Sequence, residues 1–228
     1  GSPLGAVELT IAAHYVFDAP TDKIIFDTGH QCYPHKLITG RKDNFQTLRQ
    51  YKGVCGFCNI QESEYDVFGA GHAATAISAA LGIAKARDYK NENHKVVAIV
   101  GDGSLTAGLA FEGLNNLGAD KTNMLIILND NKMSISPNVG AISNYLNQIV
   151  LKPGYFKLRK TTKGFLQRIP GIGEGGLKKV FRAQERLRNI TSEGIFFESL
   201  GFQYFGPIDG HNIDELIIAL QNIKDLEG

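Results

Sequence analysis

An aspartate between two glycines is the first feature of this sequence that could carry chemistry. The apolar run 98–100 is followed directly by Gly101-Asp102-Gly103-Ser104. Glycines at these positions would let the chain turn sharply and bring backbone N–H groups close to a ligand. A helix that begins just after such a turn presents unpaired N–H groups and its positive dipole end, which suits a diphosphate. An aspartate would repel that polyanion unless a divalent cation lay between them, so the pattern predicts a Mg²⁺–diphosphate site.

A second polar turn would supply the other oxygen ligand that the protein offers to Mg²⁺. Asn129-Asp130-Asn131 follows another apolar run, and residues 104–128 between the turns have the length of one helix plus one strand. The chain would therefore return to the same edge of a sheet. Asp102 would give a carboxylate and Asn131 a neutral amide oxygen, while the diphosphate would bring the remaining negative charge. Gly-Asp-Gly alone is a common turn, so the prediction depends on the pair.

The segments that must position these turns alternate between β-branched runs and helical stretches. We expect strands at 23–30, 65–72, 96–100 and 124–130, and helices at 73–89 and 106–118, the second closed by Gly118. Such runs, separated by helices, indicate a parallel sheet covered on both faces. The predicted fold class is α/β, with an open, mostly parallel sheet and helices on both faces. Ligands of such sheets bind beyond the carboxyl ends of the strands, where the strand order reverses. The polar groups expected at that edge are His30, Gly71-His72, 101–104 and 129–131.

Several longer stretches resemble the transketolase-like thiamine diphosphate enzymes, and among them the 1-deoxy-D-xylulose-5-phosphate synthase family. They are DTGHQCYPHKLITGR (27–41), ESEYDVFGAGH (62–72), GDGSLTAGLAFEGLNN (101–116), LNDNKMSISPNVGA (128–141) and GFQYFGPIDGH (201–211). They follow one another in consistent order, from about Leu4 to the last residue. The resemblance implies a diphosphate-binding domain whose cofactors are thiamine diphosphate and Mg²⁺.

The resemblance also implies roles for individual residues. The implied metal ligands are the side chains of Asp102 and Asn131 and the backbone carbonyl of Met133. The implied cofactor contacts are Gly103, Ser104, Asn131, His30 and the cleft-lining segment Gly71, His72 and Ala73. His30 would face the reactive thiazolium end, where it would contact substrate or help to move protons. Ala73 and Ala74 depart from the family pattern, which often has hydroxyl residues here, so we expect a backbone contact.

The implied reaction is decarboxylation of pyruvate and ligation of the two-carbon unit to glyceraldehyde 3-phosphate. The product, 1-deoxy-D-xylulose 5-phosphate, would serve isoprenoid, thiamine and pyridoxal biosynthesis. The family's pyrimidine-binding and C-terminal domains have no counterpart in these 228 residues. We therefore expect 1–228 to be one domain of a longer, homodimeric enzyme, to include an irregular, mobile excursion at about 150–195, and to be inactive alone.

Other functions and motifs agree less well with the sequence. The N-terminal subunit of a split transketolase is disfavoured by YPHKLITGR and NDNKMSIS, and a non-catalytic α/β binding domain stays open. GAGHAA (69–74) fits a relaxed dinucleotide fingerprint, but the following strand ends in VGDG rather than at an acid for a ribose. GIGEGG (171–176) follows Pro170 with no strand before it and is interpreted as a loop.

Composition and charge further limit the classes of protein to which the chain can belong. The chain is 43% hydrophobic and 21% charged, enough to bury the core of one large domain. Its formal net charge of +1 creates no general attraction for nucleic acid or an anionic membrane. No apolar run approaches the roughly 18 residues that span a bilayer. We expect a cytoplasmic protein, or one of a plastid or similar organelle if the source is eukaryotic.

Three cysteines, Cys32, Cys55 and Cys58, indicate reduced thiols rather than a disulfide framework, because their number is odd. CGFC (55–58) matches C-x-x-C, with His30 and His35 as further conceivable ligands. It has no second Cys pair for zinc and does not follow a strand, so a loop with unrelated thiols is favoured. His211 belongs to the resemblance, but the sequence assigns it no chemistry.

Overall fold

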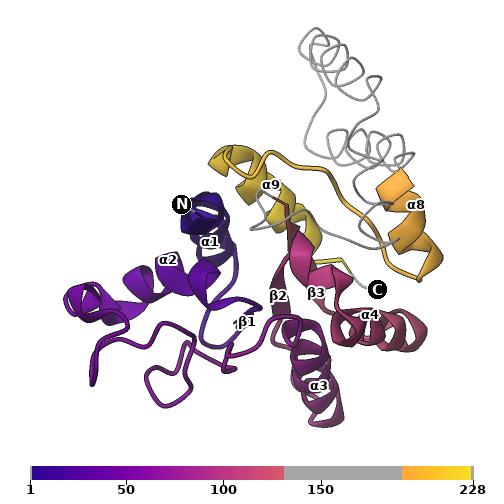
Figure 1. Ribbon diagram of the computed structural model, residues 1–228. Helices are drawn as coiled ribbons and strands as arrows, with labels where there is room; N and C mark the ends of the chain where they lie inside the picture. The colour runs from indigo at the N-terminus through magenta and orange to yellow at the C-terminus, as the bar shows by residue number, and fades with distance from the viewer. Residues whose placement is uncertain (1, 131–191, 227–228) are drawn as a thin grey trace, which may run out of the picture. The chain divides into compact units, whose positions relative to one another are not determined.

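The structure, a computed structural model, describes residues 2–130 and 192–226 (Figure 1). The chain divides into two compact units, Gly1–Pro137 with Ile208–Gly228, and Asn138–Pro207. The first unit contains a sheet and the helices that cover it. The second contributes α8 (Ser192–Ser199) to the described residues.

Three parallel strands form the sheet of the first unit. They are β1 (Lys23–Phe26), β2 (Val96–Gly101) and β3 (Leu125–Asn129), in the order β1-β2-β3. The register pairs Phe26 with Ile99, and Gly101 with Asn129. Because the strands are parallel, their carboxyl ends meet at one edge. The predicted α/β class with a parallel sheet is confirmed. Among the described residues the three strands lie side by side in chain order, so this part of the sheet does not contain the reversal of strand order at which such sheets bind ligands.

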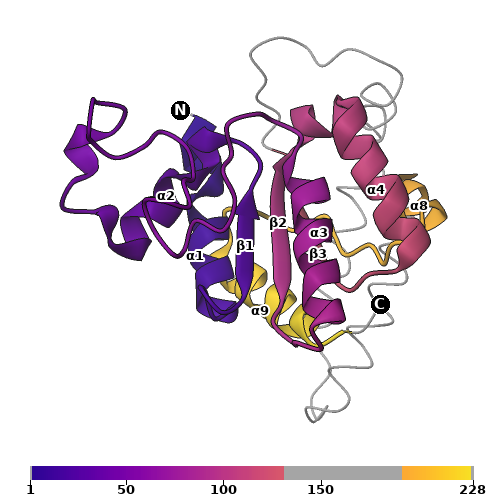
Figure 2. The ribbon, with the colours of Figure 1, turned by 90° about the horizontal axis from the view of Figure 1, so that it is seen from below.

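Helices cover both faces of this sheet (Figures 1 and 2). On one face, α1 (Val7–Val16) and α9 (Ile213–Lys224) bury a cluster that includes Ile24, Phe26, Val97 and Ile99. On the other, α3 (Ala76–Tyr89) lies against β2, and α4 (Gly108–Asp120) lies beside α3. Strands β1 and β2 are therefore buried on both sides, which explains why their sequences are continuous apolar runs, whereas β3 is half-buried along its length.

Short helical turns connect the regular elements of the first unit. They are η1 (Ser2–Ala6), η2 (Gly29–Cys32), α2 (Tyr33–Lys36), η3 (Leu37–Arg41), η4 (Phe45–Thr47) and η5 (Asp102–Thr106). Helix α9 begins at a side-chain cap, because Asn212 Oδ1 accepts a hydrogen bond from the Glu215 N–H at 3.2 Å. Its far end is attached to α1, since Lys224 Nζ donates to the Val16 carbonyl at 2.8 Å.

Three sequence predictions of local structure are wrong. The strand predicted at 23–30 ends at Phe26, because η2 begins at Gly29. Residues 65–72 form an irregular segment instead of a strand. Its Asp66 is buried among polar donors, an arrangement that a paired strand with alternating faces would not allow. Gly118 does not close its helix either, because α4 continues to Asp120 and ends at Lys121 in the left-handed conformation.

In the described part of the second unit, aromatic rings gather between α8 and the residues that follow it. The Phe197 ring stacks on Tyr204, with centroids 5.9 Å apart, and meets Phe202 edge-on at 6.5 Å.

Among the helices of the described ranges, none has both the length and the apolar character needed to cross a membrane.

Helices α3 and α4 approach each other through a glycine. A Cβ added to Gly113 would lie 2.9 Å from Ile77 Cγ2 and 3.2 Å from the Ser78 backbone nitrogen. Gly82 of α3 is exposed, and a Cβ there would have open space around it. The two helical glycines thus differ in surroundings but not in secondary structure.

We expect Gly113→Ala to destabilise the fold by about 1–3 kcal/mol, because the added methyl group forces the helices apart. Gly82→Ala is the matched control and should stabilise by about 0.5–1 kcal/mol, since alanine favours the helix and meets nothing. Urea unfolding followed by circular dichroism measures both. Equal effects of the two substitutions would contradict the close approach of α3 and α4.

Candidate functional site

The carboxyl edge of the sheet carries most of the predicted site residues that the structure describes. His30 lies in η2, shortly after β1, and Asp102, Gly103 and Ser104 form the first part of η5, directly after β2. Asp102 is half-buried, Gly103 is exposed and Ser104 is buried. The predicted ligands Asn131 and Met133 lie outside the described residues.

Helix α4 begins shortly after η5, at the same edge. Its cap residue is Ala107, whose methyl side chain makes no capping hydrogen bond. A Cβ on Gly108, the first residue of α4, would meet nothing within 4 Å. Uncapped N–H groups with open space beside them can receive an anion.

Gly101 serves a different purpose from the one predicted. Its backbone is extended, with φ −80° and ψ 152°, so a sharp turn does not require glycine here. A Cβ on Gly101 would instead lie 3.3 Å from Gln31 Nε2. Gly103 is also outside the left-handed region. The glycine at 101 therefore makes room for a neighbouring side chain, and the prediction of glycine-dependent turning is wrong for both residues.

Two buried polar atoms near this edge have no partner among the described residues. They are Gln31 Oε1 and Thr28 Oγ1, in the segment that follows β1. The Gln31 side chain is placed against Gly101, and the residue is only 5% exposed. Buried polar atoms are normally hydrogen-bonded to protein, water or ligand. Polar atoms of this kind, together with the Asp102 carboxylate, fit a polar ligand at the carboxyl edge.

Asp27 is a structural residue of the site that the sequence analysis missed. It follows β1 directly and is fully buried. Its Oδ2 accepts a hydrogen bond from the Ala74 N–H at 2.8 Å, and its Oδ1 accepts one from Ala76 at 3.0 Å. Ala74 has a left-handed backbone, with φ 70°. The sequence contains a signal for this residue, because Asp27 comes at the end of an apolar run, as Asp102 does.

This carboxylate brings the predicted segment Gly71-His72-Ala73 to the sheet edge. The three residues are exposed and precede Ala74, which Asp27 holds at the end of β1. The segment thus arrives through a side-chain contact and not through the strand predicted at 65–72. The first N–H group of α3, that of Ala76, is already bonded to Asp27. The negative charge of this carboxylate opposes the binding of a pyrophosphate at this helix start, where a dinucleotide fingerprint would place it.

His30 has the environment of a neutral imidazole. It is half-buried, and burial, together with the positive charge of Arg49, lowers its pKa below 6.5. Arg49 itself donates from Nε to the Tyr33 hydroxyl at 2.9 Å. A neutral imidazole can accept a proton or a hydrogen bond near neutral pH.

A buried network of hydrogen bonds and ion pairs, centred on Asp66, holds together the segment between η2 and α3. The Asp66 carboxylate accepts hydrogen bonds from His35 Nε2 at 2.9 Å, Arg41 Nη2 at 2.6 Å and the Asn59 N–H at 2.9 Å. Lys36 Nζ lies 3.3 Å away and also pairs with Glu62. Burial alone would raise the pKa of Asp66, but these hydrogen bonds and the positive charges hold it well below its usual range.

His14 extends this network to helix α1. Its Nε2 lies 2.9 Å from His35 Nδ1, while His35 Nε2 faces Asp66. If His35 donates to the carboxylate, its Nδ1 must accept from His14. Burial, followed by the charge that a protonated His35 would carry and by the Arg41 guanidinium, lowers the pKa of His14 to about 4. Burial also lowers the pKa of His35, against the opposing effect of Asp66.

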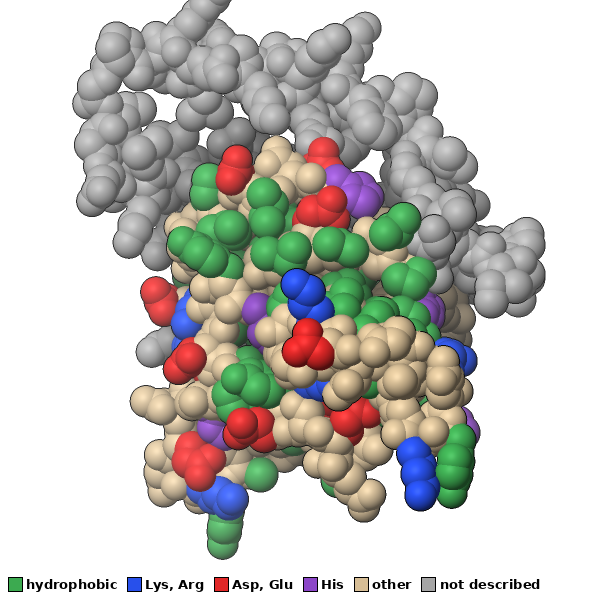
Figure 3. Space-filling model, turned by 90° about the vertical axis from the view of Figure 1, so that its left-hand side faces the viewer, with side chains coloured by type: hydrophobic (Ala, Val, Ile, Leu, Met, Phe, Trp, Pro, Cys, Tyr) green, Lys and Arg blue, Asp and Glu red, His purple; other side chains and the backbone are tan. Residues whose placement is uncertain are grey.

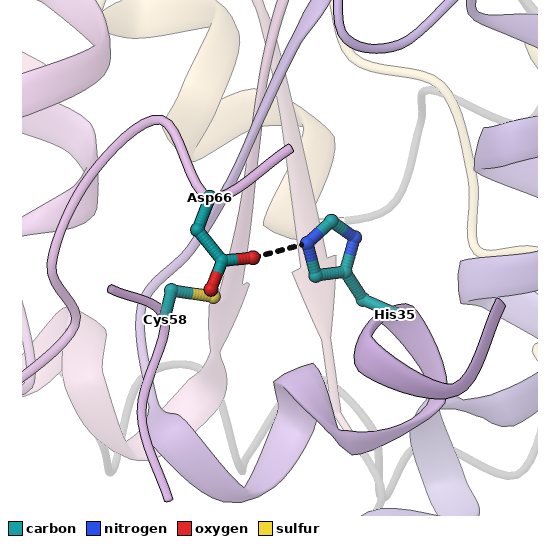
Figure 4. Close-up of side chains that lie close together, drawn as sticks. All are labelled: His35, Cys58 and Asp66. Atoms are coloured by element: carbon teal, nitrogen blue, oxygen red, sulfur yellow. Dashed lines mark hydrogen bonds and ion pairs between the residues drawn. The ribbon is translucent and has the colours of Figure 1, made fainter. Parts of the chain in front are cut away.

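His35, Cys58 and Asp66 are close enough to suggest a metal centre (Figure 4). Their potential ligand atoms lie within 4.8 Å of one another, and all three residues are buried. However, both His35 nitrogens are engaged in hydrogen bonds, and Arg41 and Lys36 contact the Asp66 oxygens. The carboxylate is therefore already neutralised, and Cys55, the other half of the C-x-x-C match, is not part of the group.

Charge on the described surface is mixed. On the side that lies at the left of Figure 1, Lys and Arg side chains stand apart from one another among hydrophobic and acidic ones (Figure 3). The described part of this face shows no continuous basic patch, which agrees with the formal net charge of +1.

Comparison with known sequences gives one consistent result. A family described as 1-deoxy-D-xylulose-5-phosphate synthase matches residues 1–228. A protein of that name from Syntrophus aciditrophicus is 57% identical over 227 residues, which cover 100% of this chain and 35% of the relative. Another, from Caldanaerobacter subterraneus subsp. tengcongensis, is 51% identical and covers 100% of this chain and 36% of the relative. The chain thus spans about a third of the length of these relatives.

Solved structures give the same fold at much lower sequence identity. Transketolase from Leishmania mexicana matches with a TM-score of 0.67 and 17% identity, over 100% of this chain and 31% of that one. Transketolase from Campylobacter jejuni matches with a TM-score of 0.60 and 21% identity, over 99% and 32% respectively. These similarities establish a transketolase-like fold.

We expect Asp27→Asn to loosen the segment that leads into α3. The amide retains one acceptor oxygen, so one of the two buried N–H groups loses its partner, at a cost of about 1–3 kcal/mol. Hydrogen exchange should show faster exchange at the Ala74 and Ala76 amides. The exposed control Asp43→Asn should stay within about 0.5 kcal/mol of the parent. Unchanged hydrogen-exchange protection of these two amides in Asp27→Asn would contradict the role given to the Asp27 carboxylate.

We expect the free energy of unfolding to fall as pH decreases from 6.5, the ordinary pKa of a histidine, to about 4, the pKa of His14 in the folded chain. In this window the unfolded chain binds a proton at His14 that the folded chain resists, so protonation favours unfolding. The share of His14 is about 1–2 kcal/mol, after allowance for its partial exposure. His14→Gln can still donate to His35 but does not titrate, so urea unfolding across this range should show a shallower slope. An identical slope in both proteins would contradict the assignment.

Proposed function

The chain belongs to the 1-deoxy-D-xylulose-5-phosphate synthase family, and from this premise we propose that it binds the diphosphate of thiamine diphosphate through Mg²⁺. The observation that carries the proposal is the position of Asp102. This half-buried carboxylate directly follows β2, at the edge where η5 begins and α4 starts without a side-chain cap. A carboxylate beside uncapped N–H groups suits a diphosphate only with a divalent cation between them.

The other ligands are proposed from the family pattern. Asn131 and the Met133 carbonyl would complete the protein ligands of Mg²⁺. Gly103 and Ser104 would donate backbone N–H groups to the diphosphate, and the exposed segment Gly71-His72-Ala73 would line the cofactor cleft, held there by Asp27.

His30 is proposed to act at the reactive end of the cofactor. Bound thiamine diphosphate would supply the thiazolium carbon at which a 2-oxo acid loses CO₂. The lowered pKa of His30 keeps the imidazole neutral near pH 7. A neutral imidazole there can accept a hydrogen bond or a proton from a substrate.

The complete reaction is proposed for the longer protein. Its substrates would be pyruvate and glyceraldehyde 3-phosphate, and its product 1-deoxy-D-xylulose 5-phosphate, a precursor for isoprenoid, thiamine and pyridoxal biosynthesis. We propose a homodimer in the cytoplasm, or in a plastid or similar organelle if the source is eukaryotic. Because the chain covers 35% of the first relative, residues 1–228 by themselves are expected to bind without turnover.

The two alternative functions are weaker. A split transketolase subunit is disfavoured by the 57% identity to a protein named as the synthase, against 17–21% identity to transketolases. A non-catalytic binding domain would have no need for the two polar turns that carry Asp102 and Asn131, and it would show no Mg²⁺-dependent binding of thiamine diphosphate.

We expect thiamine diphosphate to bind with Mg²⁺ and to bind weakly or not at all without it. Asp102→Ala should weaken binding on the order of 100-fold or more, because a direct metal ligand is lost. Isothermal titration calorimetry measures each case, with NAD as a ligand that should give no heat. Asp43→Ala, an exposed site in the same unit, is the control and should bind as the parent does. Binding that ignores Mg²⁺ or survives Asp102→Ala would overturn the proposal.

A further inference from the structure

The turn that follows β1 buries two polar side-chain atoms that no described residue satisfies. Gln31 lies in η2 and is 5% exposed, and its Oε1 has no hydrogen-bond partner among the described residues. Thr28 is the N-cap residue of the same turn, yet its buried hydroxyl makes no capping hydrogen bond and has no partner within the described ranges. Such atoms destabilise the folded chain, because they have lost water and gained no other partner.

The backbone of this turn holds the Gln31 side chain across the end of β2. The Asp27 N–H donates to the Ile99 carbonyl at 2.9 Å, and the Gln31 N–H donates to the Thr28 carbonyl at 3.1 Å, so the turn continues directly from the sheet. A Cβ at Gly101 would lie 3.3 Å from Gln31 Nε2. The amide therefore lies beside the last residue of β2, which is followed in the chain by Asp102.

The unsatisfied oxygen of Gln31 suits a water molecule bound to a cation. A buried carbonyl oxygen needs a hydrogen-bond donor, and an ionised phosphate has none to offer. Mg²⁺ that is held by a carboxylate and phosphates usually keeps several water molecules, each of which can donate. A substrate hydroxyl would also donate, but the contact with Gly101 places the amide next to the residue proposed to bind the metal.

We propose that Gln31 holds a water molecule bound to the Mg²⁺ of the diphosphate site, with Oε1 as the acceptor. This inference rests on the proposed function, because the cation is the one that Asp102 is proposed to bind. Gln31 is a positioning residue and takes part in no bond making or breaking. The ligand-free chain retains an unsatisfied buried oxygen, so that the site is already formed when the hydrated cation arrives.

The stability of the ligand-free protein separates a ligand-binding amide from a structural one. Gln31→Met has a side chain of similar length without the amide, so it removes the unsatisfied oxygen. We expect its melting temperature to equal that of the parent or to exceed it by about 2–4 °C. A lower melting temperature would show that the amide is already satisfied within the folded chain, and it would overturn the proposal.

The affinity for Mg²⁺ tests the contact itself. Isothermal titration calorimetry measures it at a fixed concentration of thiamine diphosphate, and Gln31→Met should weaken it on the order of 10–100-fold. Gln221→Met, at an exposed glutamine of α9, is the matched control and should change neither the affinity nor the melting temperature.

Inorganic pyrophosphate shows which end of the ligand is involved. It replaces thiamine diphosphate in a second Mg²⁺ titration, and Gln31→Met should cause the same loss of affinity, because the contact is with the hydrated metal. A loss that occurs with thiamine diphosphate and not with pyrophosphate would place the contact at the thiazolium or substrate end and would overturn the proposal.

The parent protein keeps the two proposals distinguishable. If the parent binds thiamine diphosphate with Mg²⁺ and Gln31→Met has the same Mg²⁺ affinity, the role of Gln31 is overturned and the proposed function stands. If the parent shows no Mg²⁺-dependent binding, the proposed function is overturned and the role of Gln31 with it.

Discussion

A single buried carboxylate decides how the edge of the sheet is built. Asp27 leaves β1 and binds the N–H groups of Ala74 and Ala76, so a strand end and the start of α3 are joined through one side chain. It compensates for the left-handed conformation of Ala74 and brings the preceding residues 71–73 to the same edge. Two charge-assisted hydrogen bonds satisfy the buried charge, which would otherwise be strongly unfavourable.

Because of this arrangement, the N-termini of α3 and α4 have different roles. The N-terminus of α3 donates to the Asp27 carboxylate, whereas the cap residue of α4, Ala107, makes no side-chain capping hydrogen bond. An aspartate that comes after an apolar strand lies near each of these helix starts, yet the two aspartates differ in environment. Asp27 is completely buried against backbone donors, and Asp102 is half-buried near the α4 terminus. The same local pattern therefore serves structure in one case and, in our proposal, metal binding in the other.

The loop between η2 and α3 depends on charge balance rather than on regular structure. Lys36 and Arg41 face Glu62 and Asp66, so two cations meet two carboxylates in a buried space. Such a group is costly to disrupt, because removal of one partner leaves an uncompensated buried charge. Through His35 and His14 it also connects the loop to α1.

The sequence by itself determined the local elements and their chemistry. Apolar runs identified β2 and β3 closely and α3 to within a few residues, and the family resemblance marked Asp102, because these signals lie within short windows. It misassigned 65–72, where an apolar run contains the buried hub Asp66. Tertiary structure decided the partners of Asp27, 47 and 49 residues away, the contact of Gln31 with Gly101, and the His35–Asp66 pair, 31 residues apart. Side chains so distant in the chain meet only when parallel strands and their crossovers are in place, and no local pattern encodes such a meeting.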